Sequence, residues 1–325
     1  FVPPSFYPIF LSVSSVKQLY LLSTLITYRT IMALIFIVRR IKIIFLCKFA
    51  PRYLTYKPLK EISMMNIAVM QLDLKWEEPL MNRHKVENLL TSLPNETDLI
   101  LLPEFFTTGF SVKNIGLAEP MNGPTVSWMQ KIAKEMNCIL AGTIPIIDHG
   151  KYYNRALYVS REGVMASYNK RHLFSLGSEH QLYTPGNKNV IVEYKNAKIQ
   201  PQICYDLRFP VWSRNRYSNF QFAYDILIYH ANWPDPRGCV WEQLLIARAI
   251  ENQAYLVGIN RCGQDGEGLS YSAPSMIINP KGNIIAQMEP AKEGVLSANI
   301  DLGELKRFRE KFFIAPDWDN FDVSP

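Results

Sequence analysis

A glutamate, a lysine and a cysteine each follow a stretch of strand-like sequence, and these three residue types can act together on a carbonyl carbon. Glu104 comes just beyond the apolar run LILLP, Lys170 follows ASYN, and Cys204 follows AKIQPQI. The three residues therefore occur in this order at three predicted strand ends. Each also has an ordinary alternative role, since Glu104 could cap a loop and Lys170 could form a solvated pair with Arg171.

Cys204 stands where the strand character of residues 197–203 ends abruptly. A sharp turn from a strand into a helix would expose its sulfur and leave the next backbone N–H groups free to bind an anion. A thiol is only partly ionised near neutrality, so it needs a nearby base or cation before it can attack a carbonyl. The alternative interpretation is a small buried hydrophobic residue, which is the commoner role for a single cysteine.

The base predicted for this thiol is Glu104, provided that a buried site raises its pKa. Lys170 can then hold a positive charge beside the tetrahedral oxyanion, together with the backbone N–H of Tyr205. A papain-like enzyme would use a histidine, but His172 lies in a loop and His230 precedes an Ala-Asn-Trp segment without a comparable relation to the cysteine. The sequence therefore predicts that a glutamate, a lysine and a cysteine divide the chemistry.

The cysteines and histidines give no support to a metal site. The histidines form no HxxxH or HExxH arrangement, and no CxxC occurs. The five cysteines are odd in number and widely spread, which argues against a disulfide framework and for a reducing compartment, the cytoplasm. They are Cys47, Cys138, Cys204, Cys239 and Cys262. We interpret Cys138, Cys239 and Cys262 as structural.

The elements that must position these residues alternate between strands and helices. Strands are predicted over residues 66–74, 98–104 and 138–146, with helices over 82–93 and 125–135 between them, which makes βαβ units. Two hairpins follow, over 151–170 and 190–204. After Cys204 we expect a short helical segment, a strand, a long helix, a strand and a hairpin, over residues 210–215, 225–233, 240–252, 254–261 and 275–287. The pattern indicates an α/β body with helices outside one mixed sheet or outside two.

The charge is divided unevenly along the chain. The whole sequence has a formal net charge of +6, but residues 1–63 hold nine basic residues against one acid. The remaining body has 26 basic and 28 acidic residues and is slightly acidic. It shows no basic stripe of the kind that binds nucleic acid.

Residues 1–63 are apolar, but Lys and Arg interrupt their apolar runs. Neither run gives the 20 or so predominantly apolar residues that a membrane-spanning helix needs, and no small-residue cleavage site follows a well-formed apolar core. We expect this segment to be a spurious or unstructured extension before a natural start at Met64 or Met65. A membrane-associating segment and a targeting peptide are the alternatives. Residues 64–325 are expected to form one large domain without a membrane segment.

From about Met65 onward, the chain resembles the nitrilase superfamily of carbon–nitrogen hydrolases. The matching stretches are LLPEFFTTGF for the glutamate, YNKRHLFSLGSEHQLYTPGN for the lysine and ICYDLRFP for the cysteine. The resemblance implies a four-layer αββα sandwich, a Glu104-Lys170-Cys204 triad, a thioester acyl-enzyme, no metal or organic cofactor, and a homo-oligomer such as a homodimer. Glu179 matches the second glutamate of the family, which helps to position substrate or lysine.

Within the superfamily, CYDLRFPVWSRN and NRCGQDGEGLSYS are most similar to the ω-amidase branch. That branch hydrolyses the terminal amide of 2-oxoglutaramate or 2-oxosuccinamate, so the expected partner is a small-molecule amide. Nitrile hydrolysis, N-carbamoyl hydrolysis and amide transfer to ammonia are alternatives that use the same triad. A third class of function is a non-catalytic or regulatory protein on this fold. The intact triad argues against it.

The substrate must be held by local groups, because the body does not attract an anion by its net charge. Arg208, a turn beyond the cysteine, is the nearest candidate for a substrate carboxylate, and pairing with Asp206 or another buried acid is its alternative. Aromatic residues beside strand ends are expected to wall a narrow pocket; they are Phe105, Phe110, Tyr205 and Trp233. The predicted substrate-binding residues are Glu179, Tyr205, Arg208 and Trp233.

We predict that a chain started at residue 64 is a soluble, active enzyme. The interrupted, basic apolar character of residues 1–63 does not match the alternating α/β pattern that follows, and the body has enough apolar residues for its own core. Specific activity of the two purified chains checks this. Precipitation of the shortened chain, or loss of its activity while the full chain stays active, would show that residues 1–63 belong to the fold or to the assembly.

Overall fold

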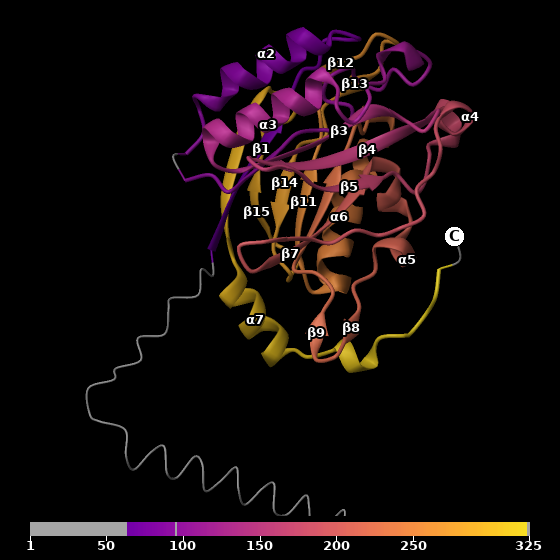
Figure 1. The fold of residues 1–325 in the computed structure, drawn as a ribbon. Helices are drawn as coiled ribbons and strands as arrows, with labels where there is room; N and C mark the ends of the chain where they lie inside the picture. Colours follow the sequence, from indigo (N-terminus) through magenta and orange to yellow (C-terminus); the bar gives the residue numbers. More distant parts are fainter. Residues whose placement is uncertain (1–63, 95, 324–325) are drawn as a thin grey trace, which may run out of the picture. The chain divides into compact units, whose positions relative to one another are not determined.

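Two six-stranded sheets pack face to face in the computed structural model, which describes residues 64–94 and 96–323 (Figure 1). The predictions for residues 1–63 lie outside the described residues. In the described part of the chain, no helix is both long and apolar enough to cross a bilayer.

The first sheet has the strand order β16-β1-β2-β3-β4-β5. Strands β1, β2 and β3 are parallel, α2 and α3 lie between them in the chain, and β3, β4 and β5 form an antiparallel meander. The bounds are β1 Met64–Gln71, α2 Pro79–Leu90, β2 Leu99–Leu101, α3 Pro124–Met136, β3 Ile139–Asp148, β4 Lys151–Ser160, β5 Gly163–Asn169 and β16 Gly294–Asp301.

The second sheet has the order β15-β14-β11-β10-β7-β6, with β7, β10 and β11 parallel. Its elements are β6 Val192–Tyr194, β7 Ala197–Ile203, α5 Pro210–Ser213, β10 Ile226–His230, α6 Gly238–Asn252, β11 Tyr255–Ile259, β14 Met276–Ile278 and β15 Ile284–Gln287. Outside the sheets lie α4 Glu179–Leu182, α7 Leu302–Lys311, and the small ribbons β8 Tyr217–Ser218 with β9 Gln221–Phe222 and β12 Gly263–Gln264 with β13 Ser270–Tyr271. Single 3-10 turns are η1 Ile115–Leu117, η2 Ser175–Gly177, η3 Cys204–Arg208, η4 Asp235–Arg237 and η5 Ala315–Asp317.

Alternating side chains of the strands build three layers of core. Leu99 and Leu101 of β2 enter the core between the sheets, whereas Ile100 packs on the other face against side chains of α3. In the second sheet, Leu227 of β10 faces the core that α6 covers. Successive residues of a strand point to opposite faces, so a strand that is buried on both faces reads as a continuous apolar run. The predicted order of helix, sheet, sheet and helix is confirmed.

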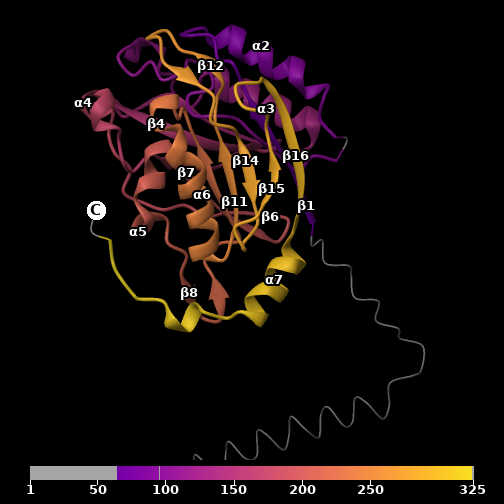
Figure 2. The ribbon, with the colours of Figure 1, turned by 180° about the vertical axis from the view of Figure 1, so that it is seen from behind.

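Two features of the fold differ from the sequence prediction. The helix expected over residues 82–93 is α2. It begins three residues earlier because Pro79 fits the first turn of a helix, and it also ends three residues earlier, at Leu90. Strand β16 and helix α7 were not predicted at all. Figure 2 shows β16 alongside β1, with α7 after it. β16 is an edge strand with mostly part-exposed side chains, so its apolar alternation is weak.

Substituting Gly258 by alanine tests the packing of α6 on the second sheet. A Cβ at this position of β11 would overlap Leu245 and come within 3.0 Å of the Trp241 ring atom Cζ2. We expect Gly258→Ala to lower the free energy of unfolding by about 1–3 kcal/mol, as overpacking of a filled core does. Gly238→Ala is the control, because its Cβ would meet only the Ala273 Cβ at 3.8 Å. Equal denaturant midpoints for the two variants would contradict this packing.

Candidate active site

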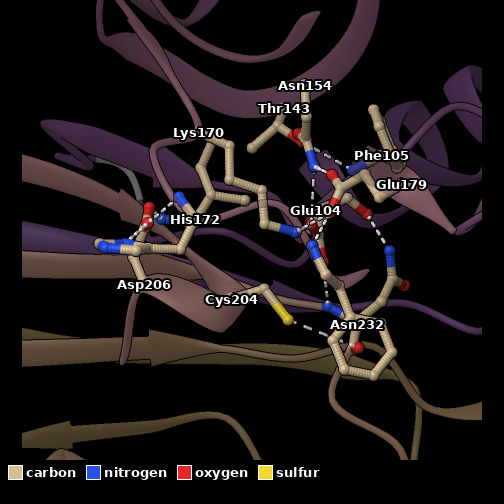
Figure 3. A network of polar contacts seen from close by, with 12 residues as sticks. Glu104, Phe105, Thr143, Asn154, Lys170, His172, Glu179, Cys204, Asp206 and Asn232 are labelled. Carbon is tan, nitrogen blue, oxygen red and sulfur yellow. Dashed lines mark hydrogen bonds and ion pairs between the residues drawn. The ribbon is translucent and has the colours of Figure 1, made fainter. Parts of the chain in front are cut away.

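The three residues predicted at strand ends meet where the two sheets face each other. Glu104 lies three residues beyond β2 and Lys170 directly after β5, both in the first sheet, whereas Cys204 follows β7 of the second sheet. Figure 3 shows the three side chains turned toward one another. Glu104 and Lys170 are completely buried, and Cys204 is half-buried at a cavity of about 300 Å³.

Lys170 is held between two carboxylates. Its Nζ donates to Glu104 Oε1 and to Glu179 Oε2, each at 2.8 Å, and all three side chains are inaccessible to solvent. Burial alone lowers the pKa of the lysine, but the attraction of the two glutamates outweighs it and raises the pKa above its ordinary value. The ammonium therefore stays protonated and supplies a fixed positive charge.

Asn154 of β4 holds the same two glutamates. Its Nδ2 donates to Glu104 Oε1 at 2.7 Å and to Glu179 Oε1 at 2.9 Å. Its Oδ1 accepts from Thr143 Oγ1 at 2.9 Å, and that hydroxyl in turn accepts from the Phe105 N–H at 2.8 Å. The two carboxylates can only accept, so they orient the amide with its NH₂ toward them and leave Oδ1 to accept the Thr143 proton.

Glu104 is also anchored from the second sheet. The backbone N–H of Asn232 donates to its Oε2 at 2.9 Å, and Asn232 Nδ2 donates to its backbone oxygen at 2.8 Å. Burial raises the pKa of Glu104, Lys170 opposes that shift, and the charge of Glu179 adds to it. A raised pKa makes the carboxylate a stronger base than an exposed glutamate.

Cys204 stands at the predicted turn, as the first residue of η3. Its backbone has a left-handed φ of +42°, which a residue with a Cβ adopts at a cost. Its Sγ lies 3.7 Å from the backbone oxygen of Asn232. Burial and then the charge of Glu104 raise the pKa of the thiol well above its usual value, and Lys170 opposes them. In the resting site the sulfur is therefore protonated, and a nucleophilic role requires a base that takes this proton.

Arg208 does not pair with Asp206, so that alternative is wrong. Asp206 accepts instead from the Tyr168 hydroxyl at 2.8 Å, from the backbone N–H of His172 at 2.9 Å and from that of Ile203 at 3.0 Å. These bonds fasten the turn that carries Cys204. The Arg208 guanidinium lies over the ring of Trp233, 5.1 Å from its centroid, and lines the cavity.

The cavity wall contains most of the predicted substrate-binding residues, with two corrections. Among the residues that line it are Phe110, Phe174, Cys204, Tyr205, Arg208 and Trp233. Phe105 is not among them, because it is 1% exposed and packs against Phe110 and Tyr183. Glu179 is not on the wall either. It accepts from Lys170 and from the Phe174 N–H, so its position suits holding the lysine rather than touching substrate.

Sequence reasoning missed Asn154, Thr143, Asn232 and Arg237 in this region. Asn232 could have been found, because it lies just beyond β10, as Glu104 lies just beyond β2. Asn154 carries no such signal, since it lies inside the strand of a hairpin. Within residues 64–94 and 96–323, no group of His, Cys, Asp or Glu is arranged to hold a metal ion.

The remaining cysteines of the described chain are free thiols. Cys138 and Cys262 are buried, in keeping with a structural role. Cys239 is exposed, so its interpretation as a structural residue is wrong.

The family model described as carbon-nitrogen hydrolase matches residues 66–310. An omega-amidase of Escherichia coli (strain K12) is 40% identical over 258 residues, which cover 79% of this chain and 97% of that protein. A 2-oxoglutaramate amidase of Bacillus subtilis (strain 168) is 33% identical over 254 residues, with 77% and 96% covered.

A crystal structure from Xanthomonas campestris has the same fold. It is a CN-hydrolase superfamily protein with an arsenic adduct in its active site, 37% identical, and it superposes with a TM-score of 0.78 over 80% of this chain and 99% of that one. The predicted resemblance to the nitrilase superfamily, and within it to the ω-amidase branch, is thereby confirmed.

Glu104→Gln and Lys170→Ala are each expected to lose most turnover. Without its base the reaction should slow by about 100-fold to 10,000-fold, and without the lysine as oxyanion donor by about 100-fold to 1000-fold. The double variant should lose far less than the product of the two, because the residues act as one unit. Single-turnover rates measure these losses, with Glu135→Gln, a surface glutamate, as control. Near-normal rates in either single variant would exclude the division of labour.

Proposed function

Because the chain belongs to the carbon–nitrogen hydrolase family, we propose that it hydrolyses the terminal amide of a small 2-oxo acid monoamide, 2-oxoglutaramate or 2-oxosuccinamate, to the acid and ammonia. The observation that carries the proposal is a single cavity with the Cys204 thiol and the Arg208 guanidinium on its wall. Such a cavity can take a short chain with an amide at one end and a carboxylate at the other. The names of the Escherichia coli and Bacillus subtilis relatives support this substrate class.

The first half of the proposed reaction forms a thioester. The Glu104 carboxylate takes the thiol proton as Cys204 Sγ bonds to the amide carbon, whose oxygen becomes an oxyanion. The Lys170 ammonium and the backbone N–H of Tyr205 stabilise that charge. The C–N bond then breaks, and the nitrogen takes the proton from Glu104 and leaves as ammonia.

The second half returns the enzyme to its starting state. A water molecule gives a proton to the Glu104 carboxylate and bonds to the thioester carbon, and the same donors hold the second oxyanion. The C–S bond breaks, the carboxylic acid leaves, and Cys204 recovers its proton from Glu104. Glu104 gains and loses one proton in each half, so one base serves both steps. Its raised pKa suits this exchange, because it must be a proton acceptor and then a donor.

The cellular location and the oligomeric state of the protein are proposed together with this function. The four free thiols of the described chain support a reducing location such as the cytoplasm. The homo-oligomer and the division into residues 1–63 and 64–325 stay predictions.

A panel of amides and nitriles tests the substrate class. We expect ammonia release from 2-oxoglutaramate or 2-oxosuccinamate with a higher kcat/KM than from neutral amides of equal length, from nitriles or from N-carbamoyl compounds. Arg208→Lys should weaken the preference for the acidic amide, because a point charge replaces a planar fork.

Cys204→Ala is the inactive control, and mass spectrometry should find the acyl adduct on Cys204 of the unmodified enzyme. Equal kcat/KM values for acidic and neutral amides would reject the 2-oxo acid substrate and leave general amidase chemistry. Faster hydrolysis of a nitrile or an N-carbamoyl compound would point to one of those reactions instead.

A further inference from the structure

A second arginine, Arg237, lines the same cavity as Arg208. It is the last residue of η4, just before α6 begins. Its guanidinium lies over the ring of Phe174, 4.9 Å from the centroid, as that of Arg208 lies over Trp233. A ring beneath the flat face of a guanidinium leaves the N–H donors at its edge available.

Neither guanidinium has an anionic or hydrogen-bonding partner among the residues that the structure describes. Other charged groups of the cavity wall do have partners. Lys113 Nζ lies 3.1 Å from Glu267 Oε1, and Lys170 is held by its two glutamates. Asp265, on the same wall, accepts from the Tyr271 hydroxyl at 2.8 Å and from the backbone N–H groups of Glu267 and Leu269. Arg208 and Arg237 are half-buried and add two positive charges without an ion-pair partner among the described residues, which favours an anionic ligand.

One side chain contacts both arginines. The Trp233 ring lies beneath Arg208, and its Nε1 donates to the backbone oxygen of Arg237 at 2.7 Å. Trp233 is itself 3% exposed, and its backbone N–H donates to Asn260 Oδ1 at 2.8 Å. The buried Trp233 thus links the Arg208 guanidinium to the backbone of Arg237.

We propose that Arg237 is a specificity-determining residue that, with Arg208, binds the carboxylate of the substrate from two sides. This inference rests on the proposed function, because it names how the acidic end of the amide is recognised. Each guanidinium can donate two parallel N–H groups to a carboxylate, and two such forks suit an anion with several acceptor oxygens, as the 2-oxo acid end provides.

The test compares Arg237→Met with Arg216→Met. Arg216 also lies over an aromatic ring, that of Phe321 at 5.6 Å, but it is exposed and does not line the cavity, so the same substitution there is a matched control. We expect Arg237→Met to lower the ratio of kcat/KM for 2-oxoglutaramate to that for pentanamide by about 10-fold to 100-fold, mainly through KM. Arg237→Met should lower the ratio of kcat/KM for glutaramate to that for pentanamide by a similar factor. Glutaramate keeps the carboxylate but lacks the oxo group. Arg216→Met should keep the wild-type ratio.

A binding measurement without turnover gives a second readout. In Cys204→Ala protein, calorimetry with 2-oxoglutarate should show a Kd that Arg237→Met raises by about 10-fold to 100-fold and Arg237→Lys by less. If wild-type enzyme shows no preference for acidic amides, both the proposed function and the two-arginine site fail. If wild type prefers them and Arg237→Met keeps both the ratio and the Kd, only the role of Arg237 is wrong.

Discussion

The buried ammonium of Lys170 is the constraint on which the active site depends. A charge without access to water costs several kcal/mol unless opposite charges and hydrogen bonds replace its hydration. Glu104 and Glu179 supply those charges, and Asn154 binds both carboxylates. The four residues come from four separate parts of the chain, so the ends of β2 and β5, the strand β4 and the short helix α4 must all meet at one point. An error in any of them would leave a buried charge unpaired.

The same arrangement explains why two sheets are needed. Lys170, Glu104 and Glu179 lie on the side of the first sheet. The Cys204 sulfur, in contrast, follows a strand of the second sheet. The apolar core between the sheets therefore sets the distance between Glu104 and Cys204. Asn232 adds a direct link, since it binds Glu104 with its backbone and side-chain N–H groups and lies next to the sulfur with its carbonyl. Preorganisation here comes from residues just beyond strand ends, whose positions the packing of the two sheets sets.

Much of this site was predictable because its signals are local. Glu104, Lys170 and Cys204 each follow a short apolar run, and a strand end can be recognised from a few neighbouring residues. Asn154 was not predictable in this way, because its partners lie 50 and 25 positions away in sequence. For Asp206, a local signal led to a wrong prediction. A nearby arginine suggested a local ion pair, but Tyr168, 38 positions away, satisfies the carboxylate instead.

The pairing of β1 with β16 has a consequence for the synthesis of the protein. Met65 of β1 lies opposite Ile300 of β16. One edge of β1 therefore stays uncovered until β16 has been synthesised. While the ribosome adds the residues between them, the free N–H and C=O groups of β1 can bind the strand of another chain. Chaperone protection of the nascent chain is thus most valuable until β16 has emerged. A shortened chain that lacks residues 294–301 would leave this edge of β1 unpaired and able to aggregate.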